Sequence, residues 1–460
     1  VHASVLEPWT HLLCAVPSLG RISSRFDCTT IMSKKLAAWG IALTCLTGFW
    51  LSGARTNQID DEIARKCESS FLADFGLGIG EAVERSMRPF VATSGSGLKI
   101  TREDHVYGLC EANLIMFKNK WYLHPETNYR KKKGKVDHAD DSGVLSVAHP
   151  EFIHGLSSAL RETQKELGVI NFPNIEFQVH TMDNTNCFRN YSAHNLAPPR
   201  APTGVVHHSY CHPELCNGTL LMPMSYNQHI AAMISSARAD DGAPPWSKRK
   251  PVAIWRGSTA QGKMDFIKRF KKDYKFKELP RARLLKIAKK SKNIDASGTF
   301  MNWKKMLTYK YNLAVMGNTY ASSFKHATRA GALVLRQEEV MYEWFEPWFE
   351  QWKHYVPVKF DLSNLETQIQ WAKANDFQAR KIAEEARKRA RNLFSPQKMA
   401  CYVFVAFRTY HDMFSYSIDS LPDGALPLDH VCRKGDYCQA LHNEFIGERG
   451  RHHNASIARS

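Results

Sequence analysis

The chain has 460 residues, enough for about two or three domains, and 43% of them are hydrophobic, which excludes a wholly disordered protein. Its 62 Lys and Arg against 45 Asp and Glu give a formal net charge of +17, which favours an anionic partner such as nucleic acid, a membrane surface or a phosphate-bearing substrate. We expect no nucleic-acid partner, because no RNA-recognition signature, Cys/His finger or basic zipper accompanies the basic runs.

The amino-terminal region has the pattern of a targeting segment. The first methionine, Met32, precedes two lysines and an uncharged stretch over 36–54 that Arg55 closes. This pattern predicts a signal peptide or a signal anchor over 32–55, the latter making a single-pass type II membrane protein; a buried core helix is the alternative. Residues 1–31 precede that methionine, and we expect them to be a leader outside the mature protein.

A secretory address agrees with the cysteines and the sequons. Three of the 11 cysteines lie in or before the hydrophobic segment, which leaves eight, an even number compatible with disulfides. Asn-x-Ser/Thr sequons occur at Asn190, Asn217 and Asn454. We therefore expect the lumen of the endoplasmic reticulum or Golgi, or secretion. The Cys- and His-rich run over 207–216 then favours disulfide-bonded surface structure over zinc, and we expect no metal site.

The first half of the chain mixes helical and strand-like segments. In chain order these are a helix-rich stretch over 59–87, a hairpin over 113–123 turning at Lys118-Asn119, a helix over 149–168, a strand-like run over 174–183 and a buried strand in 218–225. The run ADDGAPPW over 239–246 has the composition of a linker. We predict one domain over 56–245.

Beyond the linker, strands alternate with helices. The strand-like runs are PVAIWRG, KYNLAVMG, GALVLRQ and HYVPVKF, beginning at residues 251, 310, 331 and 354. One helix is predicted over 377–394, with Phe377, Ile382, Ala386 and Leu393 near one face. This alternation predicts a Rossmann-like parallel sheet in a domain over 246–415, with ligands at the carboxyl ends of its strands, followed by a tail over 416–460.

The turn after the first of these strands, Arg256–Thr259, has the residue types of a phosphate site. Glycine lets backbone N–H groups approach an anion, serine and threonine add donors, and arginine adds a two-pronged guanidinium. The alternative is an ordinary strand-to-helix turn with Ser258 or Thr259 as the helix N-cap.

A phosphate turn in the basic α/β half of a secreted chain points to a nucleotide-sugar site. The chain has no Asp-x-Asp, the usual metal-binding pair of such sites, so we expect a metal-independent site with no cofactor. Arginine, lysine, hydroxyls and helix N-termini must then hold the diphosphate, which Ser323 and Lys325 suit. Asp183, at the end of a strand-like run, is the candidate base; a turn aspartate is the alternative.

Long collinear segments carry a family resemblance. FPNIEFQVHTMD, SYCHPELCNGTLLMPMS, AIWRGST, KYNLAVMG, FKHATRAGALVL, the stretch over 342–387 and the CY at 401–402 occur in the family's order. Over residues 151–410 the chain resembles the Rumi-like, KDEL-motif-containing protein O-glucosyltransferases and the fungal capsule-associated xylosyltransferases, grouped as lipopolysaccharide-modifying glycosyltransferases.

The resemblance implies a GT-B architecture of two Rossmann-like domains facing across a cleft, the acceptor side over 56–245 and the UDP-sugar donor side over 246–415. It implies an inverting transfer of glucose or xylose from a UDP-sugar to a hydroxyl of a protein or polysaccharide, with Asp183 as the catalytic base. The implied donor-binding residues are Arg256, Gly257, Ser258, Thr259, Lys310, Tyr311, Gly317, Ser323 and Lys325.

Three positions depart from the family pattern. Met316 replaces a usual acidic residue, Ser323 stands where many animal members have arginine, and Asn184-Thr185 follow Asp183 in place of Trp-Pro. Donor sugar and acceptor therefore stay open, and a non-catalytic glycan-binding or folding-factor relative is the alternative function. The family's cysteine in a similar CY context implies a Cys67–Cys401 disulfide, and Cys432 and Cys438 are expected to close a small loop.

Overall fold

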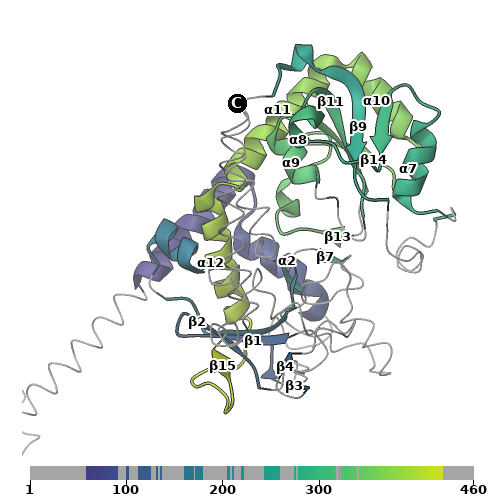
Figure 1. Cartoon of the computed structure of the whole chain (residues 1–460). Coiled ribbons are helices and arrows are strands. Elements are labelled where there is room, and N and C mark those ends of the chain that lie inside the picture. Colours follow the sequence, from purple (N-terminus) through teal and green to yellow (C-terminus); the bar gives the residue numbers. More distant parts are fainter. Residues whose placement is uncertain are drawn as a thin grey trace, which may run out of the picture. The chain divides into compact units, whose positions relative to one another are not determined.

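The computed structural model describes the chain in several stretches, and all that follows concerns them (Figure 1). These are residues 58–91, 100–102, 112–125, 131–132, 135–136, 160–169, 171–179, 205–207, 210–211, 219–221, 243–259, 274–275, 278–317, 321, 323–338 and 341–427. Asp183, the three sequons, Cys432, Cys438 and the hydrophobic segment over 36–54 lie outside them.

The first sheet contains a β-hairpin with a two-residue turn. β1 (Ala112–Phe117) and β2 (Lys120–Leu123) pair antiparallel, with Phe117 opposite Lys120. The two turn residues between them have φ angles of 47° and 63°. Positive φ at both positions matches the right-handed twist of the strands. The hairpin predicted from the alternating pattern is confirmed.

The remaining strands make this first sheet mixed. Its order is β15-β2-β1-β5-β6-β8, where β5 (Ile175–Val179) is antiparallel to β1 and parallel to β6 (Val205–His207), which is parallel to β8 (Thr219–Leu221). β15 (Leu426–Pro427), from the predicted tail, pairs with β2. A second Rossmann-like sheet was expected, but three of the five strand pairings in this sheet are antiparallel.

A disulfide joins the two ends of the described chain. Residues 58–75 form a helix that precedes α2 (Ile79–Val91), and Cys67 within it is bonded to Cys401 of α12 (Pro396–Asp412), with Cα atoms 5.2 Å apart. Both cysteines are buried. On the same helix α12, Phe404 and Phe407 pack edge-to-face on Phe172. The predicted Cys67–Cys401 disulfide is confirmed.

The second sheet has five parallel strands in the order β10-β9-β11-β12-β14. They are β9 (Lys250–Arg256), β10 (Ile294–Ser297), β11 (Tyr309–Ala314), β12 (Leu333–Gln337) and β14 (Val356–Val358). The four strands predicted in this half are confirmed. β10 was not predicted, because it lies at the edge of the sheet and only Ile294 of its four residues is buried.

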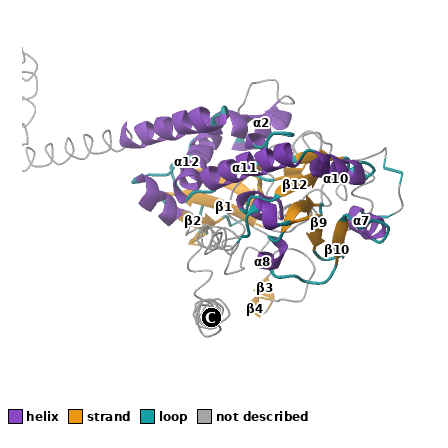
Figure 2. Cartoon of the chain, turned by 90° about the horizontal axis from the view of Figure 1, so that it is seen from above, coloured by secondary structure: helices purple, strands orange, loops and turns teal. Residues whose placement is uncertain are grey.

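Helices cover both faces of this parallel sheet (Figure 2). Alternate residues of β12 point to different cores: Leu333 and Leu335 pack in one cluster, Val334 in the other. α7 (Pro280–Ala288) and α10 (Leu365–Ala374) lie on the first face, α8 (Trp303–Met306) and α9 (Ser323–Arg329) on the second. A parallel sheet buried on both faces needs this double cover, which explains its nearly continuous apolar strands.

α11 (Asp376–Leu393) matches the predicted helix, with one correction to its buried face. Ile382, Ala386 and Leu393 are buried as expected, whereas Phe377 is 76% exposed. Five residues separate Phe377 from Ile382, and at 100° per residue this turns Phe377 well away from the buried face.

No described helix is long and apolar enough to cross a membrane.

Candidate functional site

The predicted phosphate turn lies at the point where the order of the parallel sheet reverses. From β9 the chain continues to β10 on one side, and from β11 it continues to β12 on the other, so β9 and β11 are neighbours whose connections diverge. Ligands of open α/β sheets bind at this point, outside the carboxyl ends of the strands. Gly257–Thr259 follow β9, and Gly317 follows β11 by three residues. The structure therefore brings Gly257, Ser258, Thr259 and Gly317 together at the carboxyl ends of the strands.

The exposure and packing of this turn suit a ligand-binding backbone. Ser258 and Thr259 are exposed, and Gly257 is half-buried. A Cβ atom at Gly257 would lie 3.0 Å from Cζ2 of the buried Trp255 ring. The glycine thus lets the backbone pass close over the indole ring, which a larger residue would hinder.

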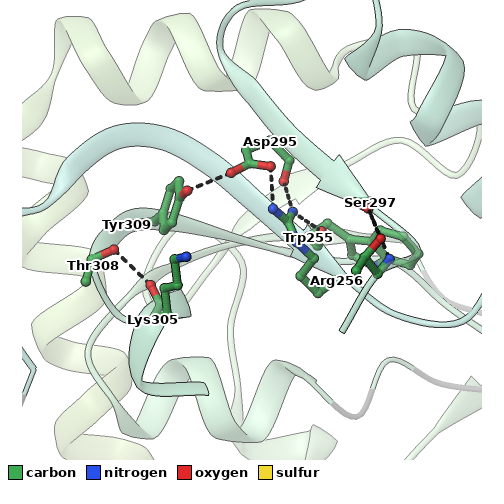
Figure 3. A network of polar contacts seen from close by, with 8 residues as sticks. Trp255, Arg256, Asp295, Ser297, Lys305, Thr308 and Tyr309 are labelled. Carbon is green, nitrogen blue, oxygen red and sulfur yellow. Dashed lines mark hydrogen bonds and ion pairs between the residues drawn. The ribbon is translucent and has the colours of Figure 1, made fainter. Parts of the chain in front are cut away.

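Arg256, the first residue of the predicted turn, is bonded to the edge strand β10 (Figure 3). Its Nη2 lies 2.6 Å from Oδ1 of Asp295, and its Nη1 donates to the carbonyl oxygens of Asp295 and Trp255, both at 2.8 Å. The side chain of Arg256 is 11% exposed. Its guanidinium therefore holds β9 to β10.

Asp295 stands at the centre of a network that spans three strands. Its Oδ2 accepts a hydrogen bond from the Tyr309 hydroxyl of β11 at 2.6 Å (Figure 3). Partial burial opposes ionisation of Asp295, but the bonds from Tyr309 and Arg256 and the charge of Arg256 outweigh it, so the pKa of Asp295 is lowered. Burial and the bond to the carboxylate raise the pKa of Tyr309. The network holds a carboxylate against the arginine.

Lys310 and Tyr311 lie in the first half of β11, where Tyr311 is paired with Ala253 in the middle of β9, three residues before Arg256. Lys310 Nζ is 2.7 Å from Oδ1 of Asp376, which also accepts a hydrogen bond from Nε1 of Trp246 at 3.1 Å. Tyr311 is 0% exposed, and burial raises its pKa to about 12. The structure does not bring these two predicted residues together with the turn, and their contacts give both a role in the fold.

Ser323 and Lys325 belong to α9, which follows the carboxyl end of β11. Ser323 is half-buried, whereas Lys325 is 6% exposed and forms an ion pair with Glu343. Burial raises the pKa of Glu343 against the opposing effect of the lysine. Lys325 and Glu343 therefore compensate one another inside the protein, and a role of Lys325 in donor binding stays a prediction.

Two residues near the carboxyl ends of the strands were missed by the sequence analysis. Gln337, the last residue of β12, accepts a hydrogen bond from the Met316 backbone N–H at 3.1 Å and donates to the Phe360 carbonyl at 2.5 Å, linking three strand ends. Arg281, in the first turn of α7, donates to the carbonyl of Ser258. The sequence signals that would have identified them are a polar residue at the end of a buried strand, for Gln337, and an arginine at the start of a helix, for Arg281.

Within the described stretches no group of three or more His, Cys, Asp and Glu could hold a metal ion. Metal independence stays a prediction.

Comparison with known proteins finds a family to which this region is similar. Residues 227–444, which contain the whole parallel sheet, match the model of glycosyl transferase family 90. Human protein O-glucosyltransferase 3 is 30% identical over 168 residues, 36% of this chain and 33% of that protein. The mouse protein O-glucosyltransferase 3 is 39% identical over 102 residues, 22% of this chain and 20% of that protein.

A third relative matches a stretch of similar length. Human protein O-glucosyltransferase 1 is 29% identical over 192 residues, 38% of this chain and 45% of that protein. The chain thus spans less than half the length of each of these curated relatives. The region around the turn is similar to glycosyl transferase family 90, and the resemblance to Rumi-like protein O-glucosyltransferases is confirmed.

Proposed function

We propose that the protein transfers a sugar from a UDP-sugar to a hydroxyl group of a protein in the secretory pathway. The family match over residues 227–444 supports glycosyl transfer. The names of the relatives, protein O-glucosyltransferases 1 and 3, favour glucose as the sugar and a protein as the acceptor. Xylose and a polysaccharide acceptor remain the other choices that the sequence left open.

One observation carries this proposal: the turn Arg256–Thr259 ends β9 at the reversal point of a parallel sheet within the matched region. Backbone N–H groups at such a position can bind the oxygens of a diphosphate, and the hydroxyls of Ser258 and Thr259 add donors. We propose that Gly257, Ser258, Thr259 and Gly317 bind the UDP moiety.

Arg256 and Ser323 keep a place in the proposed donor site. Arg256 heads the turn, and its guanidinium is bonded to Asp295. Ser323 begins the helix that follows the loop after β11. Lys310 and Tyr311 lie away from the turn and are left out of this proposal, whereas Lys325 of the same helix as Ser323 stays a candidate.

The proposed reaction is an inverting displacement that needs no metal ion. The acceptor hydroxyl oxygen bonds to the anomeric carbon of the sugar while its proton passes to the carboxylate of Asp183. The bond between the anomeric carbon and the diphosphate oxygen breaks, and its electron pair leaves with UDP. Positive charge and hydrogen-bond donors at the turn would stabilise the negative charge that develops on the leaving group.

The confirmed disulfide supports the proposed compartment. A disulfide between Cys67 and Cys401, both buried, is expected in an oxidising environment such as the endoplasmic reticulum or the extracellular space. The GT-B arrangement, with the mixed sheet on the acceptor side, remains part of the proposal.

A panel of UDP-sugars tests this function. The full chain, produced through a secretory host, is incubated with UDP-glucose or UDP-xylose and a folded acceptor protein, and release of UDP and labelling of the acceptor are measured. We expect turnover with one of the two donors. UDP binding without turnover on any donor would favour the non-catalytic glycan-binding relative, and absence of UDP binding would contradict a donor site at the turn.

A further inference from the structure

Arg281 lies between the carboxyl ends of the two strands at which the sheet order reverses. Its Nη1 donates to the carbonyl oxygen of Ser258, in the turn after β9, at 2.8 Å. Its Nη2 lies 3.5 Å from the carbonyl oxygen of Val315, directly after β11. One guanidinium thus links the predicted phosphate turn to the neighbouring strand end.

Two glycines are matched to this guanidinium. A Cβ atom at Gly317 would lie 2.6 Å from Nη2 of Arg281 and 3.0 Å from its Cζ, so only glycine leaves the guanidinium in place. The guanidinium also stacks over the ring of Trp255, 5.5 Å from its centroid, and that same ring limits the space at Gly257. Gly317 therefore packs against the guanidinium of Arg281, and Gly257 packs against the Trp255 ring on which that guanidinium stacks.

The fold of α7 has other anchors. Pro280 and Leu284 are buried, and Arg283 donates from Nε to the Asp361 carbonyl at 2.6 Å. A cation in the first turn of a helix is disfavoured by the helix dipole. The charge of Arg281 is thus unfavourable for helix α7 itself. Its contacts with the carbonyl oxygens of Ser258 and Val315 offset this cost.

We propose that Arg281 is a positioning residue for the donor diphosphate: it fixes the turn over 257–259 relative to Gly317 and adds positive charge there. This inference rests on the proposed function, because it deepens the account of the same site. It assigns the site a second arginine besides Arg256, which is held by Asp295 on the edge strand.

Titration calorimetry of the full chain with UDP and with uridine tests this role. Arg281→Met keeps the stem that covers Trp255 but removes both carbonyl contacts. We expect about a tenfold loss of affinity for UDP, the usual effect of losing a charge-assisted contact, with the affinity for uridine unchanged. A merely structural role would reduce the fraction of competent protein and weaken both ligands alike. Arg283→Met, which removes a guanidinium from the same helix, is the matched control and should leave both affinities unchanged.

A second variant covers the case in which Arg281→Met does not fold. Gly317→Ala keeps the arginine but displaces its flexible tip, so UDP affinity should fall while uridine affinity is unchanged.

The outcomes separate this inference from the proposed function. If wild-type protein binds UDP and transfers sugar, but Arg281→Met and Gly317→Ala bind UDP as wild type does, the positioning role is wrong and the function stands. If wild-type protein binds no UDP, the proposed donor site fails and this inference fails with it.

Discussion

The guanidinium of Arg256 is bonded twice to Asp295, to the carboxylate at 2.6 Å and to the backbone carbonyl at 2.8 Å. The two residues come from adjacent parallel strands, β9 and β10 (Figure 3). The arginine that the sequence assigned to a phosphate thus has an acidic partner within the protein. This relationship leads to two separate predictions, one on stability and one on binding.

Asp295→Ala should lower the free energy of unfolding by about 1–2 kcal/mol. The substitution removes the acceptor of both Tyr309 and Arg256 and leaves a largely buried guanidinium without its carboxylate. Urea denaturation monitored by tryptophan fluorescence measures the loss. Tyr309→Phe, which removes one hydrogen bond, is the control and should cost less. Equal stabilities of Asp295→Ala and wild type would show that the network is energetically neutral.

Arg256→Lys should weaken UDP binding by about tenfold although the charge is kept. A single ammonium group cannot reproduce the planar fork of the guanidinium, either toward phosphate oxygens or toward Asp295 and Trp255. Calorimetric titration with UDP measures the effect. Lys310→Met removes a cation near the start of β11, and its UDP affinity should stay at the wild-type value. Unchanged affinity in Arg256→Lys would make Arg256 a residue of the sheet alone.

Asp183→Asn should abolish sugar transfer while folding and UDP affinity stay near wild type. The amide keeps the size of the carboxylate but cannot take the proton of the acceptor hydroxyl. The measurement is the transfer rate per folded molecule, with UDP affinity determined in parallel. Retained turnover would move the base elsewhere, with His180 or His208 as the next candidates. A fall in thermal stability together with residual activity would indicate a structural turn aspartate.

Removal of the Cys67–Cys401 disulfide should lower the free energy of unfolding by about 2–5 kcal/mol. The bridge closes a loop of 334 residues in sequence and joins the helix over 58–75 to α12. The double variant Cys67→Ala/Cys401→Ala is compared with wild type by thermal denaturation without reductant. Adding reductant should lower the stability of wild type toward that of the variant. A reductant-insensitive wild type would contradict the prediction.

His354 should make the protein less stable as the pH falls from 6.5 to 4. Burial, with a smaller effect of the Arg389 charge, lowers the pKa of His354 from 6.5 to about 4, and its Nδ1 accepts the Glu350 backbone N–H at 2.9 Å. Between these pH values the unfolded chain binds a proton that the folded chain does not, so the free energy of unfolding decreases by up to about 3 kcal/mol.

Urea denaturation across this pH range measures the effect for His354. His354→Asn retains an acceptor for the Glu350 N–H but does not titrate, so its stability should depend less on pH than that of wild type. Parallel pH profiles for the two proteins would contradict a neutral buried histidine.

The sequence by itself predicted those features that depend on local pattern. The turn at Lys118-Asn119 is fixed by two neighbouring residues with positive φ, and the four apolar runs of the parallel sheet are fixed by burial on both faces. The resemblance supplied the family and the Cys67–Cys401 bridge, because both are properties of residues in a collinear order.

Only the tertiary structure decided which of the predicted residues lie together. Lys310 and Gly317 belong to one sequence motif, yet Lys310 lies near the start of β11 and Gly317 follows its end, because each residue advances a strand by about 3.3 Å. Asp295 lies beside the turn because the edge strand β10 pairs with β9. Arg281 lies beside it because the start of α7 contacts Ser258. These contacts join residues 39 and 23 positions apart in the chain, and no local sequence pattern encodes them.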